Sequence, residues 1–153
     1  MFEDKNMIYA AVCWIAILAG SFLSGYGPMI PFYSEATGYD ETHYSYLMFA
    51  KGSGALIGLS TIKYLPNYFN SKALIIIFTA VSGVSFYASY LSLNDWNLMI
   101  TYTLMSASAT FINGMVFGVI FQLFPKDPTF FISLISFMFG VGGLLGPFNV
   151  GWF

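Results

Sequence analysis

The sequence predicts an all-α protein, a bundle of transmembrane helices, and three observations support this prediction. Hydrophobic residues make up 58% of the chain and charged residues only 8%, whereas ordinary soluble domains carry roughly 25% charged residues. The mean hydropathy is +0.72. Apolar runs long enough to cross a hydrocarbon core of about 30 Å recur along the whole chain. A surface with so few charges is not solvated by water, so lipid is the expected solvent.

Five apolar runs are the expected spans. They cover residues 7–32, 44–65, 72–93, 98–124 and 129–153. The connections are short: "YSEATGYDETH", "PNYFNS", "NDWN" and "PKDP". Because no run of polar or low-complexity sequence remains, we expect residues 1–153 to form a single transmembrane domain.

The first run has an alternative interpretation as a cleaved signal peptide. Its leader, "MFEDK", holds two acids against one lysine, whereas signal peptides have a positive leader and a short apolar core of about 7–15 residues. The run from Met7 to Leu23 is longer and continues through Gly25 and Pro28. A first transmembrane span is therefore the favoured interpretation.

The lysines predict the orientation of the spans. Lys5 precedes the first span, Lys63 and Lys72 flank the second connection, and Lys126 lies in the fourth. With five spans, these three places fall on one side of the membrane. The opposite side carries only acids among its charged residues, namely Glu35, Asp40, Glu41 and Asp95. The positive-inside rule places the N-terminus on the cytoplasmic side. The membrane itself is left open: plasma membrane, organelle or mitochondrial inner membrane.

Glycines spaced four residues apart predict close helix packing, because small residues let helix backbones approach one another in lipid. The pairs are Gly54 and Gly58, Gly114 and Gly118, and Gly142 and Gly146. A single glycine pair is explained by tight helix packing, which occurs in any polytopic membrane protein. Pairs in three spans indicate a compact bundle of several helices.

Two stretches give the layout more specificity. The first span leads through a Gly/Pro-rich exit and a short loop into a glycine-bearing second span, "GYGPMIPFYSEATGYDETHYSYLMFAKGSGALIGL". The fifth ends in "GGLLGPFNVG", in which Gly142, Gly146, Pro147 and Gly151 are spaced as a glycine-proline signature and Val150 replaces one glycine. This order resembles the N-terminal half of the major facilitator superfamily, and it implies a close-packed, proline-bent helix at a moving interface.

Other signatures of that family are missing. The loop "KYLPNYFNSK" has Asn67 and Tyr68 where the family has an Asp-Arg pair. In the fourth span, Thr110 precedes Gly114 where many proton-coupled members carry an arginine. The resemblance therefore does not supply a gating ion pair or a proton-coupling arginine.

The resemblance implies a carrier that transports a small solute by alternating access, complete or partial, since the family fold has about twelve spans in two halves. Five spans complete neither half, so further helices from the same or another chain are expected as partners. The alternative is a non-transporting accessory subunit of a larger complex, for example a mitochondrial respiratory assembly.

Four polar residues within the spans are candidates for a substrate pathway: Lys51, Tyr26, Asn113 and Gln122. An ionisable group inside a span is a functional-site hypothesis by default, and Lys51 would attract an anionic solute or pair with Glu35. Its long stem could instead snorkel to the interface. For the other three, an interhelical hydrogen bond is the competing role.

The remaining residues give no basis for catalysis, so we expect no enzyme activity and no cofactor. Cys13 is the single cysteine and His43 the single histidine, so neither a disulfide within the chain nor a metal site is expected. His43 is expected to be solvated in its loop. The net charge of -2 and the lack of a basic patch argue against nucleic acid as a partner.

Overall fold

The computed structural model describes residues 5–91 and 93–150, apart from the side chains of residues 6, 26, 149 and 150. These described residues form helices and connections and no strand. The elements are α1 (Lys5–Ser24), α2 (Tyr26–Thr37), the 3-10 helix η1 (Glu41–Ser45), α3 (Tyr46–Ile62), α4 (Leu65–Tyr68), α5 (Ser71–Leu91), α6 (Asp95–Leu123) and α7 (Pro128–Val150). The all-α prediction is confirmed.

Four stretches are long and apolar enough to cross a bilayer: Met7–Thr37, Ser71–Leu91, Asp95–Leu123 and Pro128–Phe148. They fall on the first, third, fourth and fifth expected spans. The second expected span, 44–65, corresponds to α3, whose 17 residues lie at the short end of the range for a spanning helix. Residues 151–153 of the fifth expected span lie outside the described residues.

The exit from the first span differs from the expected loop. Residues 33–37 were expected to be part of a connection, but they belong to α2. This helix contains Pro31 and continues to Thr37. The helix ends where Gly38 adopts a left-handed φ of 75° and its N–H donates to the Ser34 carbonyl at 2.9 Å. The Ser34 hydroxyl also donates to the Tyr39 carbonyl at 2.7 Å. These local bonds explain why the chain turns at Gly38, because the left-handed conformation favours glycine.

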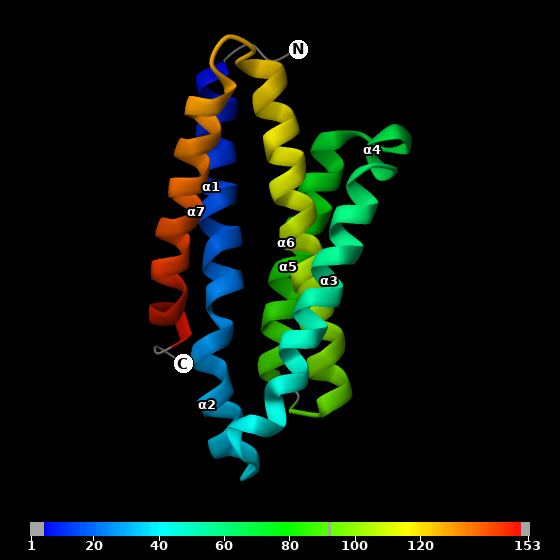
Figure 1. Cartoon of the computed structure of the whole chain (residues 1–153), viewed down its shortest axis with the longest axis vertical. Coiled ribbons are helices and arrows are strands. Elements are labelled where there is room, and N and C mark those ends of the chain that lie inside the picture. The colour runs from blue at the N-terminus through cyan, green and yellow to red at the C-terminus, as the bar shows by residue number, and fades with distance from the viewer. Residues whose placement is uncertain (1–4, 92, 151–153) are drawn as a thin grey trace.

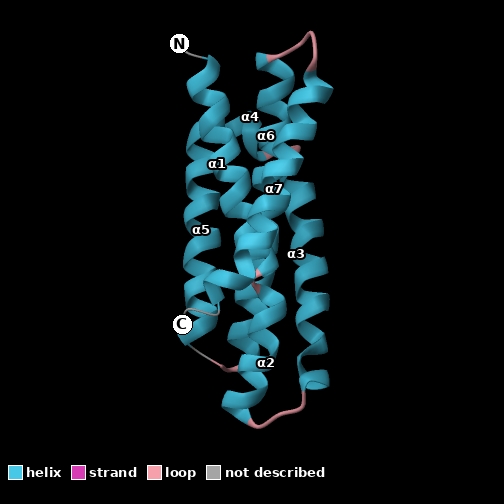
Figure 2. Cartoon of the chain, turned by 90° about the vertical axis from the view of Figure 1, so that its left-hand side faces the viewer, coloured by secondary structure: helices cyan, strands magenta, loops and turns pink. Residues whose placement is uncertain are grey.

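The helices run alternately up and down between two ends (Figure 1). The start of α1, the short α4 and the α6–α7 connection lie at one end, where Lys5, Lys63, Lys72, Lys126 and Asp127 are found; we call this the basic end. The α2–η1 segment and the α5–α6 connection lie at the other, which carries Glu35, Asp40, Glu41 and Asp95; we call this the acidic end. Figure 2 shows from the side that the connections gather at these two ends.

Helix α6 is the centre of the bundle. It is the longest helix, with 29 residues, and it contacts α1, α3, α5 and α7. In its most apolar stretch 56% of the residues are buried, against 17% to 28% in the other three spanning stretches. The Asn94 side chain caps α6 by accepting a hydrogen bond from the Trp96 N–H at 3.1 Å. The other helices therefore leave most of their apolar surface for lipid.

Helices α1 and α7 pack along their length with their backbones in contact (Figure 1). A Cβ atom added to Gly142 would overlap the carbonyl of Ile17, and one on Gly20 would overlap the carbonyl of Phe139. Ser21 ties the pair together, because its buried hydroxyl donates to the Gly142 carbonyl at 3.0 Å. This contact depends on small residues on both helices.

A second pair, α3 and α6, packs by the same means. Added Cβ atoms on Gly54 and Gly58 would overlap the carbonyl oxygens of Thr103 and Ala107. Gly58 lies one turn beyond Gly54, so the two glycines form one continuous contact strip. The strip fixes α3 against the central helix.

The other glycines that were singled out differ in their surroundings. A Cβ on Gly146 would overlap Ser21 and Ser24 of α1, and Gly114 faces the end of the Ile62 side chain. Gly118 faces open space, because Ile62, which Gly114 faces, is the last residue of α3, and Gly118 lies one turn further along α6, beyond that end. Pro147 lies inside α7, and Gly151 lies outside the described residues.

We predict that Gly142→Ala lowers the free energy of unfolding by about 1–3 kcal/mol, the usual cost of overpacking, because the new methyl group pushes α1 away from α7. Unfolding in mixed micelles, followed by circular dichroism, measures this change. The matched control is Gly143→Ala, where a Cβ meets nothing within 4 Å. The control is expected to be neutral, or stabilising by up to about 1 kcal/mol, since alanine favours helix. Equal losses in both variants would contradict the close α1–α7 contact.

Candidate functional site

Lys51 lies in α3, five residues from the start of that helix at Tyr46, or about 7.5 Å along its axis. Its side chain is half-buried. The neighbouring backbone is held to α6, because the Ser106 hydroxyl donates to the Lys51 carbonyl at 2.7 Å and the Thr103 hydroxyl donates to the Ala50 carbonyl at 3.3 Å. Lys51 is thus a cationic residue on a rigid part of the bundle, in the half toward the acidic end.

Glu35, which was considered as a partner for Lys51, is exposed on α2, and no ion pair of Glu35 with a described residue is found. The physical reason is that α2 continues as a helix beyond Phe32, which places Glu35 on the outer face of the helix instead of in a loop above α3. Among the described residues, an ion pair is found between His43 and Asp95.

The other pathway candidates occupy different parts of the bundle. Asn113 lies in the middle of α6 and is half-buried. Gln122 is exposed near the end of α6, at the basic end and therefore across the membrane from Lys51. Tyr26 begins α2, and its side chain lies outside the described part of the structure. Asn113 is the candidate with both partial burial and mid-membrane depth.

A polar and aromatic cluster at the acidic end was not predicted. His43 is exposed, as expected, and in addition its Nε2 lies 3.2 Å from Asp95 Oδ2 and its ring stacks on Tyr39 with ring centroids 4.6 Å apart. The Tyr46 hydroxyl donates to Asp95 Oδ1 at 2.9 Å. Asp95 therefore receives bonds from η1 and from the first residue of α3, and it holds both against the start of α6.

Tyrosines extend this cluster into the core. Tyr33 and Tyr44 are fully buried; the Tyr44 hydroxyl shares a hydrogen bond with Thr37 and donates to the Tyr33 carbonyl at 3.2 Å. The Tyr33 hydroxyl donates to the Ser89 carbonyl of α5 at 3.4 Å. The cluster thus ties α2, η1, α3, α5 and α6 together at one end, as a structural clamp.

The signal for this cluster was partly present in the sequence. His43 and Asp95 both fall in connections that the span count places on the same side of the membrane, and tyrosines are dense between residues 33 and 46. The pairing itself joins residues 52 positions apart, so no local pattern could reveal it.

Within the described residues, no group of three or more histidine, cysteine or carboxylate side chains is placed to hold a metal ion. Cys13 is a free, half-buried thiol in α1. Inside the bundle, Lys51 can attract a negatively charged group and Asn113 can form hydrogen bonds.

Comparisons of this chain with protein-family models, with curated proteins and with solved structures find no match.

We predict that Tyr44→Phe lowers the free energy of unfolding by about 1 kcal/mol, the usual net worth of a buried hydrogen bond, because Phe cannot bond to Thr37 or to the Tyr33 carbonyl. The matched control is Tyr39→Phe, since Tyr39 is 55% exposed and its hydroxyl makes no hydrogen bond with the described residues. Chemical unfolding of both variants in mixed micelles gives the comparison. If Tyr39→Phe lowers the free energy of unfolding as much as Tyr44→Phe does, the Tyr44 hydrogen bonds do not act as a clamp.

Proposed function

We propose that this chain is a membrane carrier of the major facilitator type, complete or partial, that moves a small solute with a negatively charged group by alternating access. The observation that carries the proposal is the position of Lys51. A half-buried lysine inside an apolar bundle is costly to desolvate, and lysine is a compact cationic contact for an anionic group. We infer that Lys51 contacts the negatively charged group of the solute.

The packing supports motion between two groups of helices. Backbone contacts at glycine hold α1 to α7 and α3 to α6, so each pair behaves as a unit. The contacts between the groups use side chains instead: Met29 of α2 packs near Leu98 and Met105 of α6, and Val12 of α1 packs near Val116. Apolar side chains, and methionine in particular, repack more easily than backbones separate. Alternating access requires such a division into rigid parts and a looser seam.

The family resemblance adds to this proposal through the contact between α1 and α7. Gly142 and Gly146 belong to the glycine-proline signature, and both face α1. Pro147 removes one backbone donor from α7, which weakens the helix next to that contact. These features fit a helix that bends at an interface. Because the Asp-Arg pair and the arginine in α6 are missing, we propose no coupling ion.

The alternative function, an accessory subunit of a larger membrane complex, is favoured by the outer face of α7. Phe130, Phe137, Leu144 and Phe148 are exposed there, and their spacing places them on one stripe of the helix. Lipid covers such a stripe in a carrier, and a partner helix covers it in an assembly. Native mass measurement in mild detergent separates the two, because a subunit co-purifies with stoichiometric partners.

We predict that Lys51→Met abolishes or reduces by at least about tenfold the uptake of the anionic substrate into proteoliposomes, because loss of one buried charge-assisted contact costs about 1.5–3 kcal/mol. The substrate is first sought by uptake of labelled monocarboxylates, dicarboxylates and phosphate by the native protein. The measurement is the initial rate of uptake at equal amounts of reconstituted protein.

The matched control for this experiment is Lys72→Met, because Lys72 is exposed at the basic end and the same charge is removed. Equal uptake by Lys51→Met and the native protein would exclude Lys51 from the pathway. The native protein could instead show uptake no faster than empty liposomes and a native mass that includes stoichiometric partners. This result would reject the carrier function in favour of the accessory subunit.

We further propose that the basic end faces the cytoplasm, as the positive-inside rule predicts. In a Cys13→Ser background, a membrane-impermeant maleimide should label Asp40→Cys in intact cells or sealed organelles of known orientation. Lys63→Cys should react only after the membrane is permeabilised, which also shows that this site is accessible. The reverse labelling pattern would invert the proposed orientation.

A further inference from the structure

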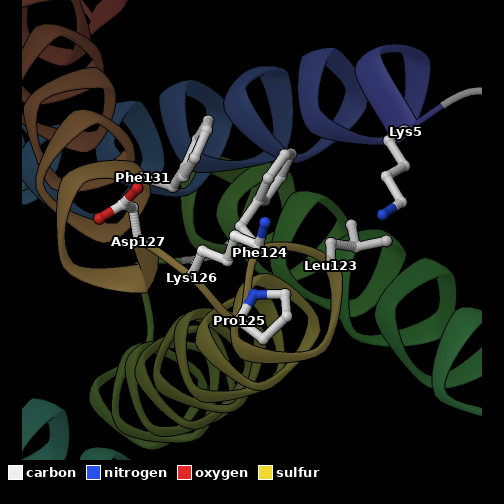
Figure 3. Close-up of a pocket in the computed structure, with 7 residues that line it drawn as sticks. All are labelled: Lys5, Leu123, Phe124, Pro125, Lys126, Asp127 and Phe131. Atoms are coloured by element: carbon white, nitrogen blue, oxygen red, sulfur yellow. The ribbon is translucent and has the colours of Figure 1, made fainter.

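A pocket of about 330 Å³ opens at the basic end of the bundle (Figure 3). Lys5 at the start of α1 lines one side, and Phe131 in the first turn of α7 lines another. The rest of the wall is the end of α6 and the α6–α7 connection, namely Leu123, Phe124, Pro125, Lys126 and Asp127. The pocket therefore lies where three membrane-length helices begin or end, at the level where hydrocarbon gives way to water.

The charged groups of the pocket are available to a ligand. Lys5 and Lys126 are both exposed, and neither forms an ion pair with a carboxylate of the described residues. Asp127 also lines the pocket, and Figure 3 shows its carboxylate on the side away from Lys5. The lining thus carries two cations and one anion, and the two cations come from different ends of the chain.

The floor of the pocket is apolar and rigid. The rings of Phe124 and Phe131 stack with centroids 3.8 Å apart and an angle of 16° between their planes. Tyr9 of α1 packs edge-on against both rings, at 5.6 Å from Phe124 and 5.2 Å from Phe131. These aromatic contacts fix the α6–α7 connection against α1, and so they hold Lys126 and Lys5 around one hollow.

We propose that this pocket binds the phosphate group of an anionic membrane lipid. Lys5 and Lys126 provide the cationic contacts, and the Phe124–Phe131 pair lies against the apolar part of the lipid next to its headgroup. Basic pockets between membrane helices are a recurrent site for anionic headgroups. The volume falls within the range of sites for small organic ligands, and a free phosphate ion would fill only a small part of it. This inference does not depend on the proposed transport function.

The test is native mass spectrometry of the detergent-solubilised protein titrated with phosphatidylglycerol and, separately, with zwitterionic phosphatidylcholine. We expect the native protein to retain phosphatidylglycerol with about tenfold or greater preference, since each lysine near an anionic lipid contributes about a factor of five. K5Q/K126Q should remove most of this preference, and the charge-conserving K5R/K126R should keep it. If K5R/K126R also loses the preference for phosphatidylglycerol, the positive charge of these residues does not explain the preference, and the proposal is overturned.

The matched control is K63Q/K72Q, which removes the same charge from the same end but outside the pocket. Retained preference in this variant supports a defined site. An equal loss of preference in K5Q/K126Q and K63Q/K72Q would overturn the proposed site, because a general attraction of the basic end for anionic lipid would then explain the preference. Circular dichroism of each variant confirms that the helices are intact.

A further arm distinguishes the lipid from a free ion. Inorganic phosphate is added to the complex of protein and phosphatidylglycerol in equimolar and hundredfold amounts. Lipid that stays bound at equimolar phosphate supports the membrane lipid as the ligand. Complete displacement by equimolar phosphate would overturn the lipid assignment in favour of a phosphate-ion site.

Discussion

The bundle depends on close contact between helix backbones at glycine. In lipid, apolar side chains gain nothing by leaving their solvent for another helix, so association relies on dispersion and on hydrogen bonds between helices. Both weaken quickly with distance, and only small residues bring the backbones near enough. The α1–α7 contact at Gly20 and Gly142 and the α3–α6 contact at Gly54 and Gly58 satisfy this requirement.

Hydroxyl side chains complete these contacts. Ser21 bonds to the Gly142 carbonyl across the first pair, and Ser106 bonds to the Lys51 carbonyl across the second. Such bonds cost little side-chain entropy because serine is short, and they fix the register of one helix against the other. The backbone at Lys51 is consequently bonded to α6, which suits the role that we propose for this residue.

The two ends of the molecule use their charges differently. At the acidic end, Asp95 is occupied by His43 and Tyr46, and the cluster joins helices of both groups. At the basic end, Lys5 and Lys126 stand around a pocket without a carboxylate partner among the described residues. Side chains of the chain itself thus hold Asp95 at the acidic end, whereas we propose that Lys5 and Lys126 at the basic end bind an anionic lipid.

The sequence by itself determined the all-helical class, the approximate bounds of the helices and the grouping of Lys5, Lys63, Lys72 and Lys126 toward one end. These follow from composition, from the length of apolar runs and from loop charges, which are properties of local sequence. The spacing of Gly142 and Gly146 also marked a contact face. Only the tertiary structure decided that this face meets α1, that Gly118 meets nothing, that Glu35 lies away from Lys51, and that His43 pairs with Asp95. Each of these outcomes depends on which distant segment lies opposite a residue, and in lipid that choice is made by the fit of whole helix surfaces, not by any pattern within one helix.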